Sequence, residues 1–196
     1  MTFNIYAQDE WFFIDMMNGK VQEVEKKVGK VHYKNRSKAY QIDFTGDGVS
    51  EYLYLEYSDG KIMAHFKDQN FEPLYKFQFP LKGHSARVYR VLKKNISQDR
   101  IMVLFHYFAG ASSYLGKAGS AFLYGGVVEN GSFKDFELTK LGSIWLEEQY
   151  RDNYLRRLYE VGFKDIDNNG QKELIIKSGP TKRVIHYEGK GKWLGL

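Results

Sequence analysis

The sequence predicts an all-β fold, and three observations indicate it. Aromatic residues make up 16% of the 196 residues, with 15 Tyr and 14 Phe but only 3 Pro. Aromatic side chains are enriched in strands, and a low proline content leaves strand ladders unbroken. Asn-Gly and Asp-Gly turns flank apolar runs, and similar segments recur along the chain. We therefore expect one domain built from up to four degenerate antiparallel sheets.

Composition narrows the class of protein. The chain is 43% apolar and 27% charged, which is typical of a globular domain, and no run approaches the roughly 20 apolar residues of a membrane span. It has no Cys, which excludes disulfides and thiolate metal sites. The net charge of +5 allows weak attraction to polyanions, but no nucleic-acid motif accompanies the basic clusters, so nucleic acid is not an expected partner. Residues 1–7 lack the basic and apolar regions of a complete secretion signal.

An internal repeat sets the expected boundaries. Residues 10–21 can be laid over residues 51–62 without a gap, and both segments contain Asn-Gly-Lys or Asp-Gly-Lys, a strong hairpin signal. The repeats are predicted at about 1–37, which is incomplete, and at 38–82, 84–141 and 155–196.

The strands follow from apolar runs bounded by turn residues. In the second repeat they are expected at 39–44, 52–57, 61–67 and 73–79. In the third repeat they are expected at 86–92, 100–105, 121–128 and 132–140. In the fourth repeat they are expected at 159–164, 173–177 and 183–188.

Two further features concern the architecture. Residues 143–158 carry aromatic and aliphatic residues near helical spacing, which predicts one short helix. The recurrence of strand, turn and strand at roughly 40 to 60 residues is typical of propellers and solenoids. If the array closes, residues 2–6 would pair with the strand near residue 183 and remove an exposed edge.

Two loops carry a pattern suited to a hard cation. The second, Asp-Ile-Asp-Asn-Asn-Gly-Gln-Lys-Glu at 165–173, has oxygen side chains at positions one, three, five and nine and Gly at six. The first, Asp-Phe-Thr-Gly-Asp-Gly-Val-Ser-Glu at 43–51, repeats the pattern with Thr45 at position three. An EF-hand is excluded, because Tyr54 and Ile176 stand at position twelve, where that motif needs Glu. A metal-free Asx-type turn is the open alternative for both loops.

This spacing, followed by a short apolar strand, resembles the FG-GAP and VCBS repeats of integrin-type β-propellers. The resemblance implies a propeller-like array with structural Ca²⁺, and the second loop fits it more closely than the first. The turn at 93–99 has two lysines and no carboxylate ring, so no metal is expected there. The implied ligands in the second loop are Asp165, Asp167, Asn169, Glu173 and the carbonyl of Gln171. Those in the first loop are Asp43, Thr45, Asp47, Glu51 and the carbonyl of Val49.

The family context also implies export, to the periplasm, the cell surface or the medium. Extracellular modules bind calcium at about 10⁻⁴ to 10⁻³ M, which suits such a compartment. A cation that binds only the native arrangement of the three carboxylates would stabilise the fold.

Function is open between two classes. The sequence contains no local nucleophile, metalloprotease or phosphate-loop motif, which favours a non-catalytic module that binds a protein or a glycan. The Gly-, Ser- and Tyr-rich stretch at 106–120 is the expected contact loop, with ligand-binding residues His106, Tyr107, Tyr114 and Arg87. The alternative is a polysaccharide-acting enzyme whose site is assembled around the same four residues.

Overall fold

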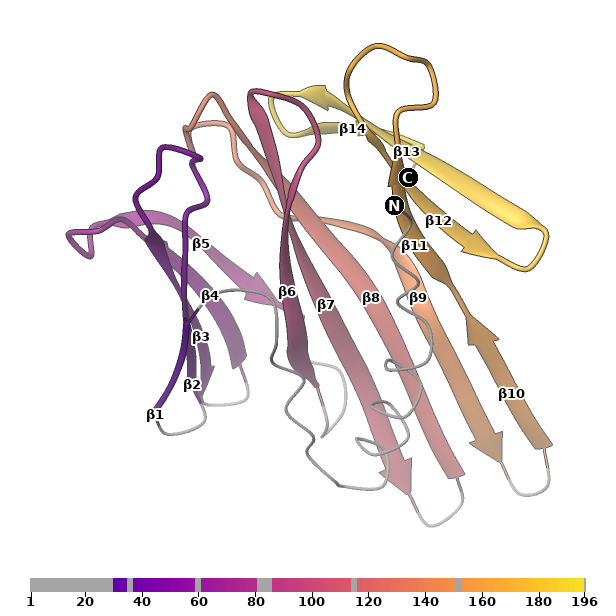
Figure 1. Ribbon diagram of the computed structural model, residues 1–196. Helices are drawn as coiled ribbons and strands as arrows, with labels where there is room; N and C mark the ends of the chain where they lie inside the picture. Colours follow the sequence, from indigo (N-terminus) through magenta and orange to yellow (C-terminus); the bar gives the residue numbers. More distant parts are fainter. Residues whose placement is uncertain are drawn as a thin grey trace.

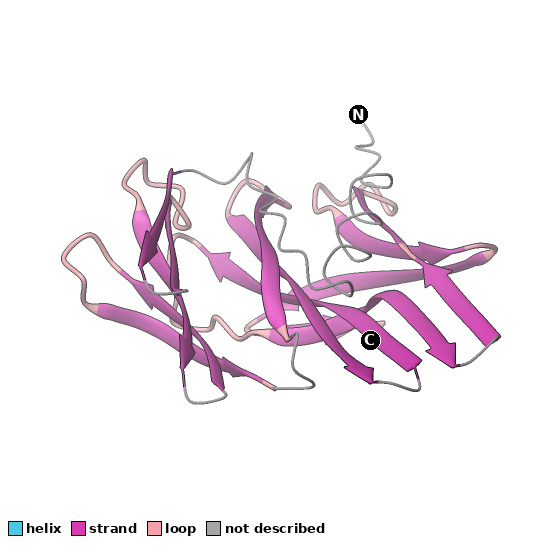
Figure 2. Cartoon of the chain, turned by 90° about the horizontal axis from the view of Figure 1, so that it is seen from below, coloured by secondary structure: helices cyan, strands magenta, loops and turns pink. Residues whose placement is uncertain are grey.

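The computed structural model describes residues 30–34, 37–58, 61–80, 86–113, 116–150 and 153–195, and these form three antiparallel sheets without a helix. The predicted all-β class is therefore confirmed. The sheets stand next to one another in chain order and none of them closes (Figures 1 and 2). Most of the first predicted repeat, and residues 2–6 with their expected pairing, lie outside the described residues. No helix with the length and apolarity of a membrane span occurs in the described part of the chain.

Sheet 1 is a meander in which each strand pairs with the next. The four strands predicted for the second repeat are confirmed to within two residues. In β4 (Lys61–Lys67) the side chains alternate between the core and the outer face, as expected for a sheet with one covered face. The strands are β1 (Lys30–Lys34), β2 (Ser37–Ile42), β3 (Glu51–Ser58), β4 (Lys61–Lys67) and β5 (Pro73–Phe79).

Sheet 2 has the strand order β10-β9-β8-β7-β6. Its structure differs from three of the expectations from the sequence. The described residues of the expected contact loop, 106–113 and 116–120, are not a loop, because they are the paired ends of two long strands. The segment 132–140 is a strand only from Thr139, and before that it is an irregular connection that buries Phe133 and Phe136. The strands are β6 (Arg87–Asn95), β7 (Arg100–Ser113), β8 (Gly116–Glu129), β9 (Thr139–Tyr150) and β10 (Asn153–Leu158).

The third correction concerns the short helix predicted at 143–158, which was wrong. This segment is the hairpin of β9 and β10, with Trp145 paired to Leu158 across it. Strand β9 also pairs along β8, so it satisfies an edge of backbone N–H and C=O groups that a helix would leave open. The predicted helical spacing combined apolar residues that belong to two separate strands.

Sheet 3 follows the prediction for the fourth repeat and adds one short strand. Its order is sequential, β11-β12-β13-β14. The strands are β11 (Glu160–Lys164), β12 (Glu173–Ser178), β13 (Thr181–Gly189) and β14 (Lys192–Leu194).

Strand β7 shows why sheet 2 is the middle layer, since residues 101–110 are buried on both faces. Val103, Phe105 and Tyr107 belong to a core shared with sheet 1. Met102, Leu104 and Phe108 belong to a second core shared with sheet 3. The period-two alternation of a strand thus divides one apolar run between two interfaces.

One turn from each sheet lies at the same end of the molecule. Residues 43–50, 96–99 and 165–172 all appear at the top of Figure 1. Both loops with the cation pattern are therefore at this end, separated by the shorter turn of sheet 2.

Candidate metal centre

The loop at 165–173 joins β11 to β12 and contains one buried carboxylate. Glu173 begins β12 and is 1% exposed. Its Oε2 atom accepts the N–H of Ile166 at 2.7 Å, which fixes the carboxylate against the start of the loop. Its Oε1 atom is also buried and has no hydrogen-bond partner. Burying a carboxylate oxygen without a hydrogen bond is costly, so this atom is the part of the loop most suited to a cation.

The other oxygen side chains of this loop are half-buried at Asp165 and exposed at Asp167 and Asn169. Asp165 accepts the N–H of Asn169 at 3.1 Å and that of Gly170 at 2.9 Å. Asp167 accepts the N–H of Asn169 at 3.2 Å and its side-chain amide at 2.9 Å. These Asx-type bonds set the turn. A carboxylate offers about four acceptor positions, so both aspartates retain capacity for a cation.

The loop at 43–51 has a comparable buried carboxylate with less free capacity. Glu51 is 5% exposed and accepts the N–H of Phe44 at 2.6 Å. Its other oxygen accepts the hydroxyl of Thr45 at 3.0 Å. Both carboxylate oxygens therefore have partners inside the protein, which distinguishes Glu51 from Glu173.

The two loops share their construction. In each, the position-nine glutamate accepts the N–H of position two, and the position-five oxygen accepts the N–H of position seven. Positions four and six also adopt left-handed backbone conformations in both loops. Their φ values are 82° for Gly46 and 87° for Gly48 in the first loop, and 59° for Asn168 and 86° for Gly170 in the second.

The structure gathers two groups of potential ligand atoms, each within 4.8 Å of one another. The first group is Asp43, Asp47 and Glu51, and the second is Asp167, Glu173 and His186. All but His186 were expected from the sequence. Of the remaining expected side-chain ligands, Thr45 bonds to Glu51, while Asp165 and Asn169 hold the turn of the second loop.

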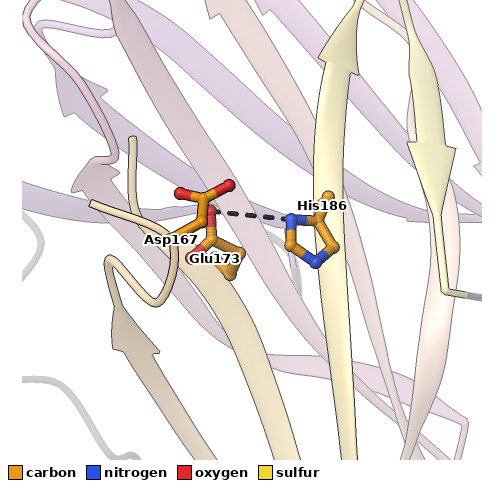
Figure 3. A group of neighbouring side chains, drawn as sticks. All are labelled: Asp167, Glu173 and His186. Carbon is orange, nitrogen blue, oxygen red and sulfur yellow. Dashed lines mark ion pairs between the residues drawn. The ribbon is translucent and has the colours of Figure 1, made fainter. Parts of the chain in front are cut away.

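His186 is the member of the second group that the sequence did not reveal. It lies on β13, next to the pairing of Ile185 with Leu174, and so stands opposite Glu173. Its Nδ1 atom is 3.6 Å from Glu173 Oε1 (Figure 3). The sequence of the hairpin did contain a signal. Ser178 and Thr181 close its turn, and Glu173 and His186 each lie five positions from the turn, one on each strand. Counting outward from that turn places both side chains on one face.

Lys93 has an unexpected position. It belongs to β6 of sheet 2, but its ammonium group reaches the first loop and donates to the carbonyl of Asp43. The same ammonium lies 3.5 Å from the Asp43 carboxylate. A positive charge is therefore already present at the first loop, where it would oppose a metal ion.

A polar network ties the second loop to sheet 2. Arg100 donates to the side-chain amide oxygen of Gln171 and lies 3.4 Å from Glu129. Glu129 also accepts the hydroxyl of Tyr187 at 2.6 Å. Burial, followed by this hydrogen bond, raises the pKa of Tyr187, so its hydroxyl remains a donor. In addition, the N–H of Lys172 donates to the carbonyl of Ile96 at 2.8 Å. The loop is thus fixed at its end nearest sheet 2.

Two of the expected ligand-binding residues are buried in β7. His106 and Tyr107 are 1% and 0% exposed, and they lie on opposite faces of β7. Arg87 is half-buried at the start of β6, and Tyr114 lies outside the described residues. Burial, with a smaller contribution from the charge of Arg90, lowers the pKa of His106 to about 3. The ring is therefore neutral inside the sheet.

Comparison with known proteins adds no relative: no protein-family model, curated protein or solved structure matches this chain.

Proposed function

We propose that this protein is an exported, calcium-stabilised and non-catalytic module that binds a protein or a glycan. The observation that carries the proposal is the construction shared by the two loops. Each has a buried glutamate at position nine with at least one further carboxylate close to it. Two loops that share two hydrogen bonds and two left-handed positions, but differ in sequence, indicate one structural purpose. A ring of oxygens around a sharp turn is the arrangement that Ca²⁺ prefers.

The second loop is the principal calcium site in this proposal. Glu173 has a buried oxygen without a hydrogen bond, whereas both oxygens of Glu51 accept hydrogen bonds within the first loop. Lys93 also places its charge against Asp43. Calcium at the first loop would have to displace that contact.

The outer face of sheet 1 supports a binding role. Phe71 is 51% exposed and stacks on Tyr52, with ring centroids 4.6 Å apart. Tyr52 in turn stacks on Tyr54 at 6.1 Å, and the Lys67 ammonium lies 5.9 Å from the Tyr54 ring centroid. Phe71 has a φ of 66°, which is strained for a bulky residue and is often found at functional positions. We place the ligand-contact surface here rather than at the hairpin of β7 and β8.

Calcium titration tests the metal part of the proposal. Calorimetry and thermal melting on the wild type should show binding at about 10⁻⁴ to 10⁻³ M and a raised melting temperature. Asp165→Ala should abolish most of the heat, because it removes a carboxylate and the turn it holds.

Asp43→Ala is the matched control, since it removes the position-one carboxylate from the other loop. It should leave most of the binding heat in place. Absence of binding at millimolar calcium would reduce both loops to Asx-type turns, and equal losses in the two variants would contradict the ranking of the sites.

A further inference from the structure

We infer that Asp167, Glu173 and His186 form a binding site for a transition-metal dication of the Zn²⁺ class. This inference concerns a ligand set different from the calcium ring, although the two sets share Asp167 and Glu173. The site uses one imidazole nitrogen and two carboxylate oxygens, drawn from the loop, β12 and β13 (Figure 3).

The donor chemistry supports this metal class. Imidazole suits Zn²⁺, Cu²⁺ and Ni²⁺, whereas Ca²⁺ takes oxygen ligands. His186 is therefore unneeded in an oxygen-only calcium ring. Its presence across from the buried glutamate is what sets the second loop apart from the first, whose group contains only carboxylates.

The distances also fit a small cation. Zinc binds nitrogen and carboxylate oxygen at about 2.0 to 2.2 Å, so two ligands of a tetrahedral site stand roughly 3.4 Å apart. The separation between His186 Nδ1 and Glu173 Oε1 is 3.6 Å. A cation between these two atoms needs only a small adjustment of the side chains.

Glu173 provides the independent observation. Its side chain is fully buried, and its Oε1 atom, the one facing His186, has no hydrogen-bond partner. The other oxygen is oriented by the N–H of Ile166, as outer-shell contacts commonly orient metal ligands. The carboxylate is thus held in place with one oxygen directed at the proposed metal.

Access and charge are favourable as well. Asp167 is exposed and His186 has 39% of its side chain exposed, so an ion can enter from solvent. Two carboxylates neutralise a dication, which leaves no net charge next to the buried glutamate. Three protein ligands leave a fourth tetrahedral position for water. Because Asp167 and Glu173 are shared, zinc and calcium should compete for this end of sheet 3.

Zinc calorimetry on the full chain tests the inference, with NMR of the histidine ring nitrogens as a second measurement. Wild-type protein should bind one Zn²⁺ with a shift of His186 Nδ1. His186→Gln should weaken zinc affinity at least tenfold while calcium binding remains. His65→Gln is the matched control, because His65 also pairs with a glutamate, Glu56, at 3.3 Å but belongs to no such group among the described residues.

The outcomes separate this inference from the calcium proposal. Zinc binding that is unchanged in His186→Gln, or a folded wild type that binds no zinc, would overturn the zinc site and show that His186 only forms an ion pair with Glu173. Zinc binding without any calcium binding would reject the calcium proposal and support the zinc site. Equal loss of zinc in His65→Gln would indicate adventitious binding and also overturn the inference.

Discussion

At the scale of the residue, His106 illustrates how the fold decides what a side chain can do. The sequence placed it at the opening of a Gly- and Ser-rich stretch, which suggested an exposed ligand contact. In the structure its Nδ1 atom lies 3.4 Å from the hydroxyl of Tyr89 inside the second core. Because it is buried, His106 is expected to make the stability of the fold sensitive to acid and not to contact a ligand.

The depressed pKa of His106 predicts a pH-dependent stability. The unfolded chain binds a proton near pH 6.5, whereas the folded chain resists protonation until about pH 3. Between these values the unfolded state holds more protons, so stability is full above pH 6.5 and falls as the pH decreases. The slope is about 1.4 kcal/mol per pH unit.

The test compares urea unfolding of wild type and His106→Gln at pH 7.5 and pH 5. From pH 7.5 to pH 5, the free energy of unfolding should fall by about 2 kcal/mol less in the variant than in wild type, because the variant's side chain does not titrate. It should be less stable at pH 7.5, since packing around Tyr89 is altered. Equal losses in the two proteins would show that His106 does not contribute to the acid sensitivity.

At the scale of the element, the second loop depends on one backbone conformation. Gly170 has a φ of 86°, and no atom lies within 4 Å of the point where a Cβ would stand, so space alone would allow a side chain there. Gly162 in β11 is equally open but lies in a strand. The two glycines differ in backbone conformation and not in crowding.

This difference predicts opposite effects of alanine. Gly170→Ala should lower the free energy of unfolding by about 1 to 2 kcal/mol, because an L-residue is strained at positive φ. Gly162→Ala should be neutral or stabilising by up to about 1 kcal/mol, since alanine restricts the unfolded chain. Both are measured by urea unfolding in chelator, so that metal binding does not contribute. A Gly170→Ala variant as stable as wild type would contradict the backbone argument.

At the scale of the whole molecule, the order of the sheets decides which surfaces are free. Sheet 2 is covered by sheet 1 on one face and by sheet 3 on the other. The outer face of sheet 1 stays accessible and carries the stack of Phe71, Tyr52 and Tyr54. The proposed contact surface follows from this layering and not from the composition of a loop.

A glycan array in millimolar calcium tests that surface. Phe71→Ala should reduce binding of wild-type glycan ligands at least tenfold, because a rigid exposed ring supplies much of the contact area. Leu194→Ala is the matched control, since Leu194 is also 51% exposed but lies on sheet 3. Equal binding by wild type and Phe71→Ala would show that the contact surface lies elsewhere.

Local alternation and turn chemistry were enough to predict the all-β class, most of the strands and the two acidic loops, because these features depend on residues close together in the chain. The same reasoning failed at residues 143–158, where the free edge of β8 selected strands over a helical spacing. Tertiary structure was needed to show that β7 is buried on both faces, that Lys93 reaches Asp43, and that His186 stands beside Glu173. The reason is physical: burial and side-chain contacts across strands or sheets depend on register and layering, which join residues far apart in the chain.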